Sequence, residues 1–235
     1  MYSKRINSFE ELHNTLKRYR KTNQWLFRGH SNLEWELVPK GGREPYNLHK
    51  DKDIFEAWSR QAISFLNGSL DEWDMLTIAQ HHGLATRLLD WTFNPLVAAF
   101  FAVQHYEEGD AVIHAYFTSN NLETKENKPF ENEGIIKIKP NSAASRVARQ
   151  SGIFTIHNPP VLSLKDNLEK DDKLEKIIID KSYRNELRHV LNHYGINEFS
   201  LLPDLDGLSK HVNWFMENYN YWTGNIDEEL DSITE

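Results

Sequence analysis

The spacing of apolar residues predicts a protein that mixes helices and strands. In the helical segments apolar residues recur every three to four positions, which places them on one face. Two of these segments have clear start signals, because Ser8 is a favoured N-cap residue and Asn94 is followed by Pro95, the preferred order at a first turn. The predicted helices cover residues 6–20, 52–68, 70–83, 94–109, 142–152, 181–195 and 204–219.

Shorter apolar or alternating runs between these helices predict strands. Bulky apolar side chains before a glycine are typical of a strand that ends in a turn, as in QWLFRG from residue 24. The predicted strands cover residues 24–29, 84–91, 110–118, 134–140, 153–157 and 196–203, with one more at the end of the charged stretch 168–180. Helices and strands do not simply alternate, so the predicted fold class is mixed α/β, of the α+β kind.

The polar segments do not divide the chain further. Residues 119–133 lack periodicity and predict an exposed loop, and the acidic end 225–235 is expected to fray. The sequence has no internal repeat and no linker-like stretch. We therefore predict one domain over residues 1–235, with a motif-bearing core at about 22–220 and an acidic tail at 221–235.

Composition argues against several classes of protein. The chain has 235 residues and a net charge of −8, which argues against sequence-independent binding of nucleic acid because such binding requires phosphate neutralisation. It has no cysteine, so disulfides, thiolate metal sites and cysteine nucleophiles are ruled out. The charged start lacks the apolar core of a signal peptide, and the longest apolar run, PLVAAFFAV, is too short to cross a bilayer. A cytoplasmic protein without membrane contact is expected.

Arg28 occupies an unusual place, directly after the apolar run WLF. A guanidinium keeps its charge at any physiological pH, so an arginine at the end of a core strand needs an anionic partner. Glu34, Glu36 or Asp90 could supply that partner from within the protein. A bound ligand could supply it instead, and the sequence leaves both interpretations open.

A second segment, AQHHGLATRLLDWTFNPLVAAFFA, places polar residues between a predicted strand and a predicted helix. Arg87 lies in the strand. The strand ends at Asp90, Trp91 and Thr92, and the helix follows at once. Since the N-terminus of a helix attracts anions, this arrangement predicts a phosphate site. The alternative is that Arg87 and Asp90 form an internal ion pair and that His81 is an ordinary core histidine.

Together these two segments resemble the FRG domain family, which is named for a Phe/Tyr-Arg-Gly motif. The matching residues are WLFRGH, from Trp25, and QHHGLATRLLDWTFNPLVAAFFA, from Gln80. Two further stretches fit the same pattern, RQSGIFTIH from Arg149 and YGINEFSLLPDLDGLSKHV from Tyr194. The resemblance extends from about Trp25 to Val212. It implies no activity by itself.

A second resemblance, to ADP-ribosyltransferases of the arginine-serine-glutamate type, implies both a fold and a reaction. These enzymes have a strand that ends in Tyr/Phe-Arg-Gly, a strand that ends in serine or threonine before a helix, and a glutamate that opens a strand of the form EVLLP. FRG, DWTFNPLVAAFF and NEFSLLP stand in the same order here. The resemblance implies a split β-sheet with helical additions, and NAD-dependent transfer of ADP-ribose to a macromolecule.

Carried over residue by residue, this resemblance implies NAD as the substrate and Glu198 and Arg28 as the catalytic residues. Arg28 would bind the NAD phosphates, and Glu198 would stabilise the positive charge that develops on the ribose as nicotinamide leaves. Convergence of Arg28, Thr92 and Glu198 on one cleft would support this reading, and a distant Glu198 would count against it. The implied cofactor-binding residues are Arg28, Gly29, His30, His81, Arg87, Asp90, Trp91 and Thr92.

Two departures from the transferase pattern leave the acceptor open. Asp90-Trp91-Thr92 replaces the serine-rich run, and Ile196 stands where arginine-modifying enzymes have a second acidic residue. The resemblance implies a macromolecular acceptor, and the sequence does not show whether it is a protein or a nucleic acid. The resemblance further implies a bacterial toxin or a phage-defence effector, with an antitoxin or immunity protein as its partner.

Two other functions compete with transfer of ADP-ribose. The first is a non-catalytic module whose Arg28 pocket binds a nucleotide or an acidic ligand. The second is a metal-dependent hydrolase, because His189 and His193 lie four positions apart on one predicted helix face, with Glu186 one turn earlier. Val190 occupies the position of the glutamate in zinc proteases of the His-Glu-x-x-His type, so no metal is expected.

Overall fold

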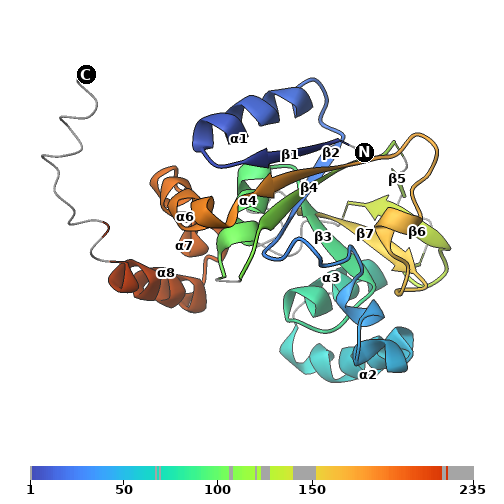
Figure 1. The fold of residues 1–235 in the computed structure, drawn as a ribbon. Coiled ribbons are helices and arrows are strands. Elements are labelled where there is room, and N and C mark those ends of the chain that lie inside the picture. Colours follow the sequence, from blue (N-terminus) through green and yellow to red (C-terminus); the bar gives the residue numbers. More distant parts are fainter. Residues whose placement is uncertain are drawn as a thin grey trace, which may run out of the picture.

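The computed structural model describes residues 2–66, 68, 70–105, 108–119, 121–122, 128–139, 152–218 and 221. Its strands form one mixed β-sheet with helices packed on it, which confirms the predicted mixed α/β class (Figure 1). The predicted helix over 142–152 lies outside the described residues except for Gly152, and the acidic end 225–235 lies outside them altogether. No helix in the described ranges has both the length and the apolar character needed to cross a membrane.

The order of strands in the sheet is β1-β8-β4-β2-β3-β7-β6-β5, so strands that are distant in the sequence lie side by side. β1 is parallel to β8 and β5 is parallel to β6, and the other neighbours are antiparallel. The strands are β1 (Ser3–Ile6), β2 (Trp25–His30), β3 (Leu88–Thr92), β4 (Ala111–Phe117), β5 (Asn121–Leu122), β6 (Gly134–Ile138), β7 (Gly152–Asn158) and β8 (Lys173–Ile179).

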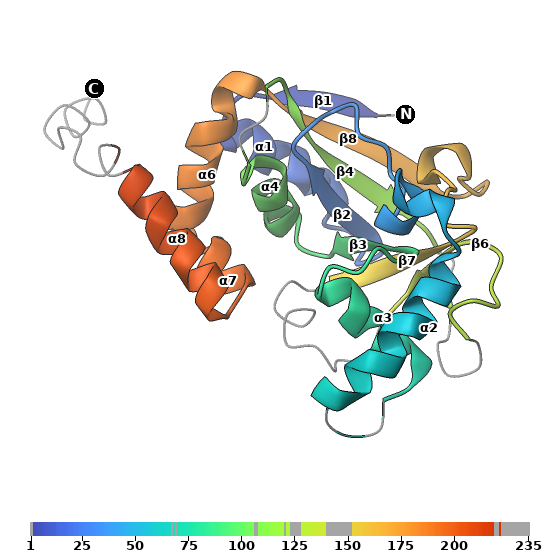
Figure 2. The same cartoon turned by 90° about the horizontal axis from the view of Figure 1, so that it is seen from below.

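The helices form two separate groups beside the sheet (Figure 2). α1 and α4 pack against β1, β8, β4 and β2, and the main hydrophobic core forms between them. α2 and α3 pack beside β3, β7 and β6 around a second core. The helices are α1 (Phe9–Leu16), α2 (Asp51–Ala62), α3 (Glu72–His81), α4 (Pro95–Val103), α6 (Arg184–His193), α7 (Glu198–Leu201) and α8 (Leu205–Glu217).

The predicted helix start signals are confirmed. The hydroxyl oxygen of Ser8 accepts a hydrogen bond from the amide of Glu11 at 3.3 Å, as an N-cap residue does. The side-chain oxygen of Asn94 accepts from the amide of Leu96 at 2.9 Å, and Pro95 is the first residue of α4. α4 begins at Pro95, shortly after β3 ends at Thr92.

Few backbone pairs join β2 to β3 in the middle of the sheet. β2 pairs with β4 at each of its six residues. It pairs with β3 at one position, where Phe27 lies opposite Thr92. Past this pair the backbones of β2 and β3 are no longer hydrogen-bonded, so the part of β2 that contains Arg28 has a free edge toward β3.

Gly29 lets α4 lie directly on β2. A Cβ atom at position 29 would stand 1.9 Å from the carbonyl oxygen of Ala98 and 2.5 Å from the amide nitrogen of Ala102. Both contacts involve the helix backbone, which cannot turn aside as a flexible side chain can. Only glycine fits after Arg28, because the backbone of α4 occupies the space that a Cβ atom would need.

The strand predicted over residues 196–203 is wrong, because the structure has the short helix α7 at Glu198–Leu201. A capping box explains the difference. The side chain of Asn197 accepts from the amide of Ser200 at 3.0 Å, and the hydroxyl of Ser200 accepts from the amide of Asn197 at 3.1 Å. These reciprocal bonds start a helix at the place where the apolar pattern suggests a strand.

β1 has no counterpart among the predicted strands. The helix predicted from residue 6 begins at Phe9, and Ile6 is the last residue of β1. Ile6 lies opposite Ile179 of β8. The strand therefore owes its existence to a partner near the other end of the described chain, which no local pattern can reveal.

Candidate functional site

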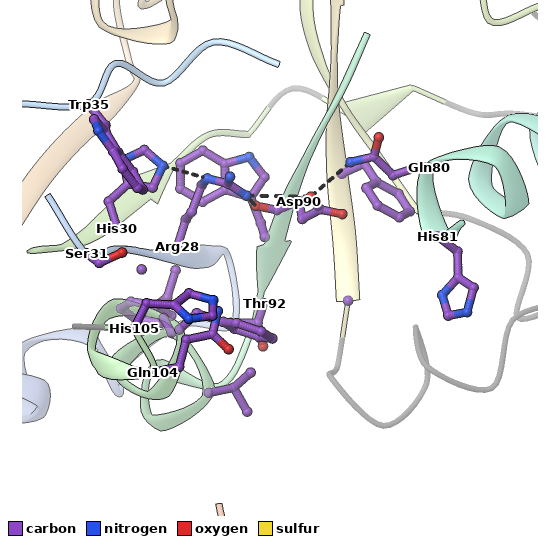
Figure 3. A pocket seen from close by; sticks show the side chains of 18 of the residues that line it. Arg28, His30, Ser31, Trp35, Gln80, His81, Asp90, Thr92, Gln104 and His105 are labelled. Atoms are coloured by element: carbon purple, nitrogen blue, oxygen red, sulfur yellow. Dashed lines mark hydrogen bonds and ion pairs between the residues drawn. The ribbon is translucent and has the colours of Figure 1, made fainter. Parts of the chain in front are cut away.

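A pocket of about 440 Å³ opens where β2 and β3 part (Figure 3). Its walls come mainly from β2, β3, α3, α4 and the start of β7, and Trp35 and Arg43, from the segment after β2, also line it. Elements far apart in the sequence thus share one cavity. Of the residues predicted to bind a cofactor, those that line it are Arg28, Gly29, His30, His81, Asp90, Trp91 and Thr92.

Arg28 reaches from β2 toward β3 and is held by two hydrogen bonds. Its Nε donates to Nε2 of His30 at 2.9 Å, and its Nη1 donates to the backbone oxygen of Asp90 at 2.8 Å. The carboxylate of Asp90 lies 3.6 Å from Nη1, so their ion pair is looser than either bond. Burial lowers the pKa of Arg28 and Asp90 opposes that shift. Nη2 makes no hydrogen bond to a residue that the structure describes, which leaves its N–H groups available to a ligand.

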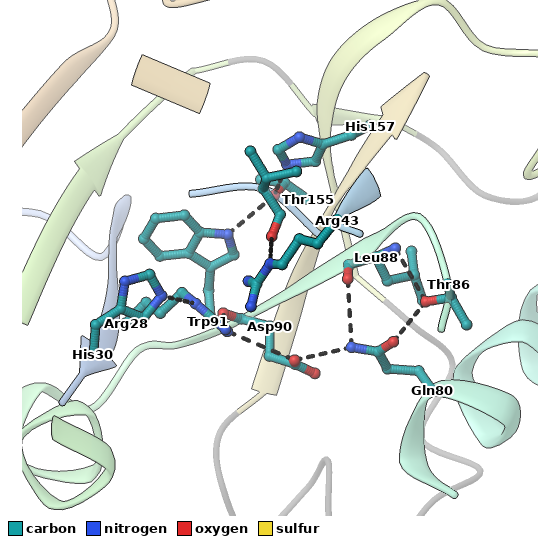
Figure 4. Close-up of polar contacts among 11 residues, drawn as sticks. Arg28, His30, Arg43, Gln80, Thr86, Leu88, Asp90, Trp91, Thr155 and His157 are labelled. Carbon is teal, nitrogen blue, oxygen red and sulfur yellow. Dashed lines mark hydrogen bonds and ion pairs between the residues drawn. The ribbon is translucent and has the colours of Figure 1, made fainter. Parts of the chain in front are cut away.

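A chain of hydrogen bonds fixes the side chain of Asp90 (Figure 4). Nε2 of Gln80 donates to Oδ2 of Asp90 at 2.9 Å, and Oε1 of Gln80 accepts from the hydroxyl of Thr86 at 2.5 Å. The hydroxyl oxygen of Thr86 accepts in turn from the amide of Leu88 at 3.1 Å. If the Gln80 amide turned over, its carbonyl oxygen would face the Asp90 carboxylate, and the bond to Asp90 would be lost. Asp90 is therefore held in place although its side chain is 55% exposed.

Arg43 adds a second cation to the pocket. Its Nε donates to the carbonyl of Val38 at 2.8 Å, and it forms no ion pair with a carboxylate in the described part of the chain. Burial lowers the pKa of Arg43, while the negative charge of Asp90 acts in the opposite direction. The arginines and carboxylates that line the pocket are thus Arg28, Arg43 and Asp90. Their sum is positive in a chain with a net charge of −8, which favours an anionic ligand.

His30 supports Arg28 as a neutral acceptor. The ring is 3% exposed, and burial, followed by the positive charge of Arg28, lowers the pKa of His30 to about 2. Because Nε2 accepts from Arg28, the ring proton is on Nδ1. The ring of His114 lies beside it, with centroids 5.1 Å apart, and burial lowers the pKa of His114 to about 3. Both rings are uncharged at neutral pH and leave the charge of the pocket to the arginines and Asp90.

The rest of the wall offers aromatic faces and polar groups. Trp35 is 45% exposed, and Phe101 and Phe154 also line the cavity. The hydroxyl of Thr77 is buried in the wall and makes no hydrogen bond to any described residue. Gln104 adds an amide near the end of α4. The pocket therefore combines cations with aromatic surface and with unused hydrogen-bonding capacity.

Trp91 and Thr92 hold the end of β3 in place beside the pocket. Nε1 of Trp91 donates to the hydroxyl oxygen of Thr155 at 3.0 Å, and that hydroxyl lies 2.9 Å from Nε2 of His157. Burial lowers the pKa of His157 to about 4, which keeps it neutral in this chain of bonds. The hydroxyl oxygen of Thr92 accepts from the amide of Asn94 at 3.0 Å. These contacts tie the end of β3 to β7 on one side and to α4 on the other.

Arg184, the first residue of α6, holds three backbone segments around the pocket. It is 7% exposed. Its Nη1 donates to the carbonyls of Ser31 at 2.8 Å and Gly109 at 2.9 Å, and its Nη2 donates to the carbonyl of His105 at 2.9 Å. Ser31 and His105 line the pocket. Sequence reasoning missed this residue, because nothing local distinguishes it from other helix-start arginines.

Arg87, predicted to bind a cofactor, lies outside the pocket lining. Its side chain is 6% exposed and forms a two-point ion pair with Asp51, the first residue of α2. Nε lies 2.7 Å from Oδ2 and Nη2 lies 2.8 Å from Oδ1. The guanidinium also lies over the ring of Phe130, 4.4 Å from its centroid. Arg87 therefore joins α2 to the sheet, and Asp90, its alternative partner from the sequence, contacts Arg28 instead.

Glu198, the predicted catalytic carboxylate, is not among the residues that line the pocket. Its side chain is 8% exposed and forms an ion pair with Arg188 of α6. Nδ1 of His211, on α8, lies 3.9 Å from its other oxygen. Arg188 lies over the ring of Trp214, 4.7 Å from the centroid. The cluster joins α6, α7 and α8, so the structure does not bring Glu198 and Arg28 into one cavity.

Glu198→Gln is expected to lower the free energy of unfolding by about 2 kcal/mol, because Arg188 loses its charged partner in a largely buried position. Urea unfolding of the wild-type and variant proteins measures the change. The double variant Arg188→Met with Glu198→Leu removes both charges and serves as the control, and it should recover most of the loss. An unchanged unfolding midpoint in Glu198→Gln would contradict the structural role.

The histidine pair considered as a metal site lies on α6, and its first member is enclosed by aromatic rings. The centroid of His189 is 5.0 Å from that of Trp214 and 3.6 Å from that of Tyr221. Its Nδ1 is 2.8 Å from the carbonyl of Asn185. No group of three or more histidine, aspartate and glutamate side chains within the described ranges is arranged to hold a metal ion.

Comparison with known families matches residues 23–111 to the model of the FRG domain. The matched segment includes β2, α2, α3, β3 and α4, and so it contains most of the residues that line the pocket. No significantly similar chain was found among curated proteins or among solved structures.

Proposed function

We propose, for a chain that carries an FRG domain and so belongs to that family, that the pocket between β2 and β3 binds a nucleotide through its phosphate groups. The observation that supports this most is the state of Arg28. Two nitrogens of its guanidinium are bonded within the protein, and Nη2 has no hydrogen bond to the described residues. A guanidinium that is held in place and has its Nη2 free suits a phosphate oxygen, which accepts charge-assisted hydrogen bonds.

The balance of charge supports the same ligand class. Arg28 and Arg43 both line the cavity, and the one negative charge of Asp90 acts on both guanidinium groups. A desolvated cation is costly unless an anion meets it. A ligand with more than one phosphate group would supply the negative charge that the protein provides only in part.

The size and the walls of the cavity suit the rest of a nucleotide. A volume of about 440 Å³ falls within the range of small-molecule sites. Trp35, Phe101 and Phe154 offer aromatic faces for a planar base, and Thr77 and Gln104 offer groups that hydrogen-bond to its edge. NAD is the first nucleotide to test, together with ADP, because the resemblance to ADP-ribosyltransferases implies it.

Transfer of ADP-ribose is the reaction that this resemblance implies, with Glu198 as the carboxylate beside the ribose. The ion pair of Glu198 with Arg188 and its place outside the pocket lining weigh against that role. We therefore propose binding as the function of the pocket. Transfer is measured separately, as release of nicotinamide from NAD in the presence of cell extract. Release by the wild-type protein that is lost in an Arg28 variant would demonstrate a reaction at this site.

Arg28→Lys is expected to lower the affinity for ADP and NAD by about 10- to 100-fold, since lysine keeps the charge but cannot offer paired N–H groups in a fixed plane. Isothermal titration calorimetry measures the affinities. Arg60→Lys, an exposed arginine on α2 outside the pocket, is the matched control and should bind as the wild type does. Equal affinities in the two variants, or no binding of either nucleotide by the wild-type protein, would contradict the proposal.

A further inference from the structure

Asp90 is the one carboxylate among the described residues that line the pocket. It lies 3.6 Å from Nη1 of Arg28, and its side chain is 55% exposed. Oδ2 accepts from Gln80 at 2.9 Å, whereas Oδ1 has no hydrogen bond to a described residue (Figure 4). A cavity whose arginines suit an anion therefore also presents a carboxylate oxygen with an open acceptor position.

This carboxylate is unfavourable for a bare phosphate. Two negative charges a few ångströms apart repel each other, and that repulsion offsets part of the attraction from Arg28. A carboxylate oxygen accepts hydrogen bonds and donates none. The group that suits Oδ1 of Asp90 is therefore a hydroxyl or amine donor on the same molecule as the phosphate.

We infer that Asp90 selects ligands that have hydroxyl donors close to their phosphate groups, and that the ligand class of the pocket is the ribonucleotides. Their ribose has two neighbouring hydroxyls, at the 2′ and 3′ positions, that can donate to one carboxylate. In this arrangement the phosphates lie at Arg28 and Arg43 and the ribose lies at Asp90. The inference rests on the proposed binding of nucleotides.

The acceptor is fixed before any ligand arrives. The amide of Gln80 is bonded to Asp90 at one end and to the hydroxyl of Thr86 at the other. Its Nε2 also lies 3.4 Å from the carbonyl of Leu88. A preordered acceptor discriminates between ligands more strongly than a mobile one, because no freedom is lost when the donor binds. An aspartate free to rotate in solvent would give little selection.

Three ligands separate hydroxyl recognition from phosphate binding: pyrophosphate, ADP and 2′,3′-dideoxy-ADP. In calorimetry the wild-type protein is expected to bind ADP about 10- to 100-fold more tightly than dideoxy-ADP. Asp90→Asn keeps an oxygen for Gln80 but replaces the free carboxylate oxygen with an amide donor. In this variant the preference should fall to about 3-fold or less, while pyrophosphate should bind about 3-fold more tightly or better. Asp166→Asn, outside the pocket, should change neither value.

Each other outcome overturns the inference, and each does so in a recognisable way. If the wild-type protein binds ADP and dideoxy-ADP equally, the inference is wrong while the proposed function stands. If Asp90→Asn weakens all three ligands alike, Asp90 serves only to orient Arg28, and the inference is again wrong. If the wild-type protein binds none of the three ligands, the proposed function fails and the inference fails with it.

Discussion

Gly29→Ala is expected to lower the free energy of unfolding by about 3 kcal/mol or more, because the new methyl group would meet the backbone of α4. The nearest atoms are the carbonyl oxygen of Ala98, at 1.9 Å, and the amide nitrogen of Ala102, at 2.5 Å. Relief requires α4 to move away from β2, which would open the main core and widen the pocket. Urea unfolding measures the loss of stability, and the same variant should bind ADP more weakly.

Gly134→Ala is the matched control for this substitution. Gly134 has a φ of 78°, and a methyl group added there would have no atom of the described residues within 4 Å, so the control tests backbone strain without a clash. Its expected cost is about 1–2 kcal/mol. Equal effects of the two variants, or a Gly29→Ala protein that unfolds at the wild-type urea concentration, would show that α4 does not depend on close contact with β2.

Asp51→Ala is expected to lower the free energy of unfolding by about 3–5 kcal/mol, because it leaves the Arg87 guanidinium buried without its carboxylate. The two side chains are 9% and 6% exposed, and Nη1 of Arg87 already lacks a hydrogen-bond partner among the described residues. Loss of the pair should loosen α2 from the sheet while leaving the lining of the pocket intact. Urea unfolding gives the stability, and ADP affinity below the transition should stay close to that of the wild type.

The control for Asp51→Ala comes from the same helix turn. Asp53 also lies in the first turn of α2, is exposed and has no ion pair within the described part of the chain, so Asp53→Ala should cost less than about 1 kcal/mol through the helix dipole alone. The double variant Asp51→Leu with Arg87→Met should recover much of the stability by replacing the pair with apolar packing. A single Asp51→Ala variant as stable as Asp53→Ala would refute the structural role of the pair.

Features set by neighbours in the chain could be predicted from the sequence. Ser8 and Asn94 were expected as N-caps and are N-caps, because the bonds they make lie within three residues. The strand that contains Arg28 was expected over residues 24–29 and is β2. The tripeptide Phe-Arg-Gly also has a local explanation. Side chains alternate along a strand, so the side chain of Arg28 is on the opposite face of the sheet from Phe27 and Gly29.

Features set by distant partners could not be predicted. Asp51 and Arg87 form their pair across a helix and a long connection, and the nearer Asp90 was an equally reasonable partner for Arg87 by sequence. The sequence gives one indication of where Arg43 lies, which is the pair of glycines directly before it. A Cβ at Gly41 would stand 2.7 Å from the carbonyl oxygen of Thr86, so the glycine lets this loop return to the start of β3. That contact becomes visible only in the folded chain.

The segment NEFSLLP shows how two local signals compete. Its apolar residues suit the strand predicted over residues 196–203. Asn197 and Ser200 are also spaced as a capping box, and this spacing prevailed in the structure. The placement of Glu198 outside the pocket lining follows from this choice, because α7 packs with α6 and α8 and not in the sheet.

The strand order limits how the family segment could be used in isolation. The match covers residues 23–111, but β2 is bordered by β4 and β3 is bordered by β7, both of which lie almost entirely beyond the match. Ser31 and His105 are held by Arg184, which lies beyond it as well. A fragment cut at the family boundaries would expose unpaired strand edges on both sides and lose the clamp on the pocket rim. The recognisable motif is therefore shorter than the smallest piece that could be transplanted with the whole pocket, and that piece extends at least into α6.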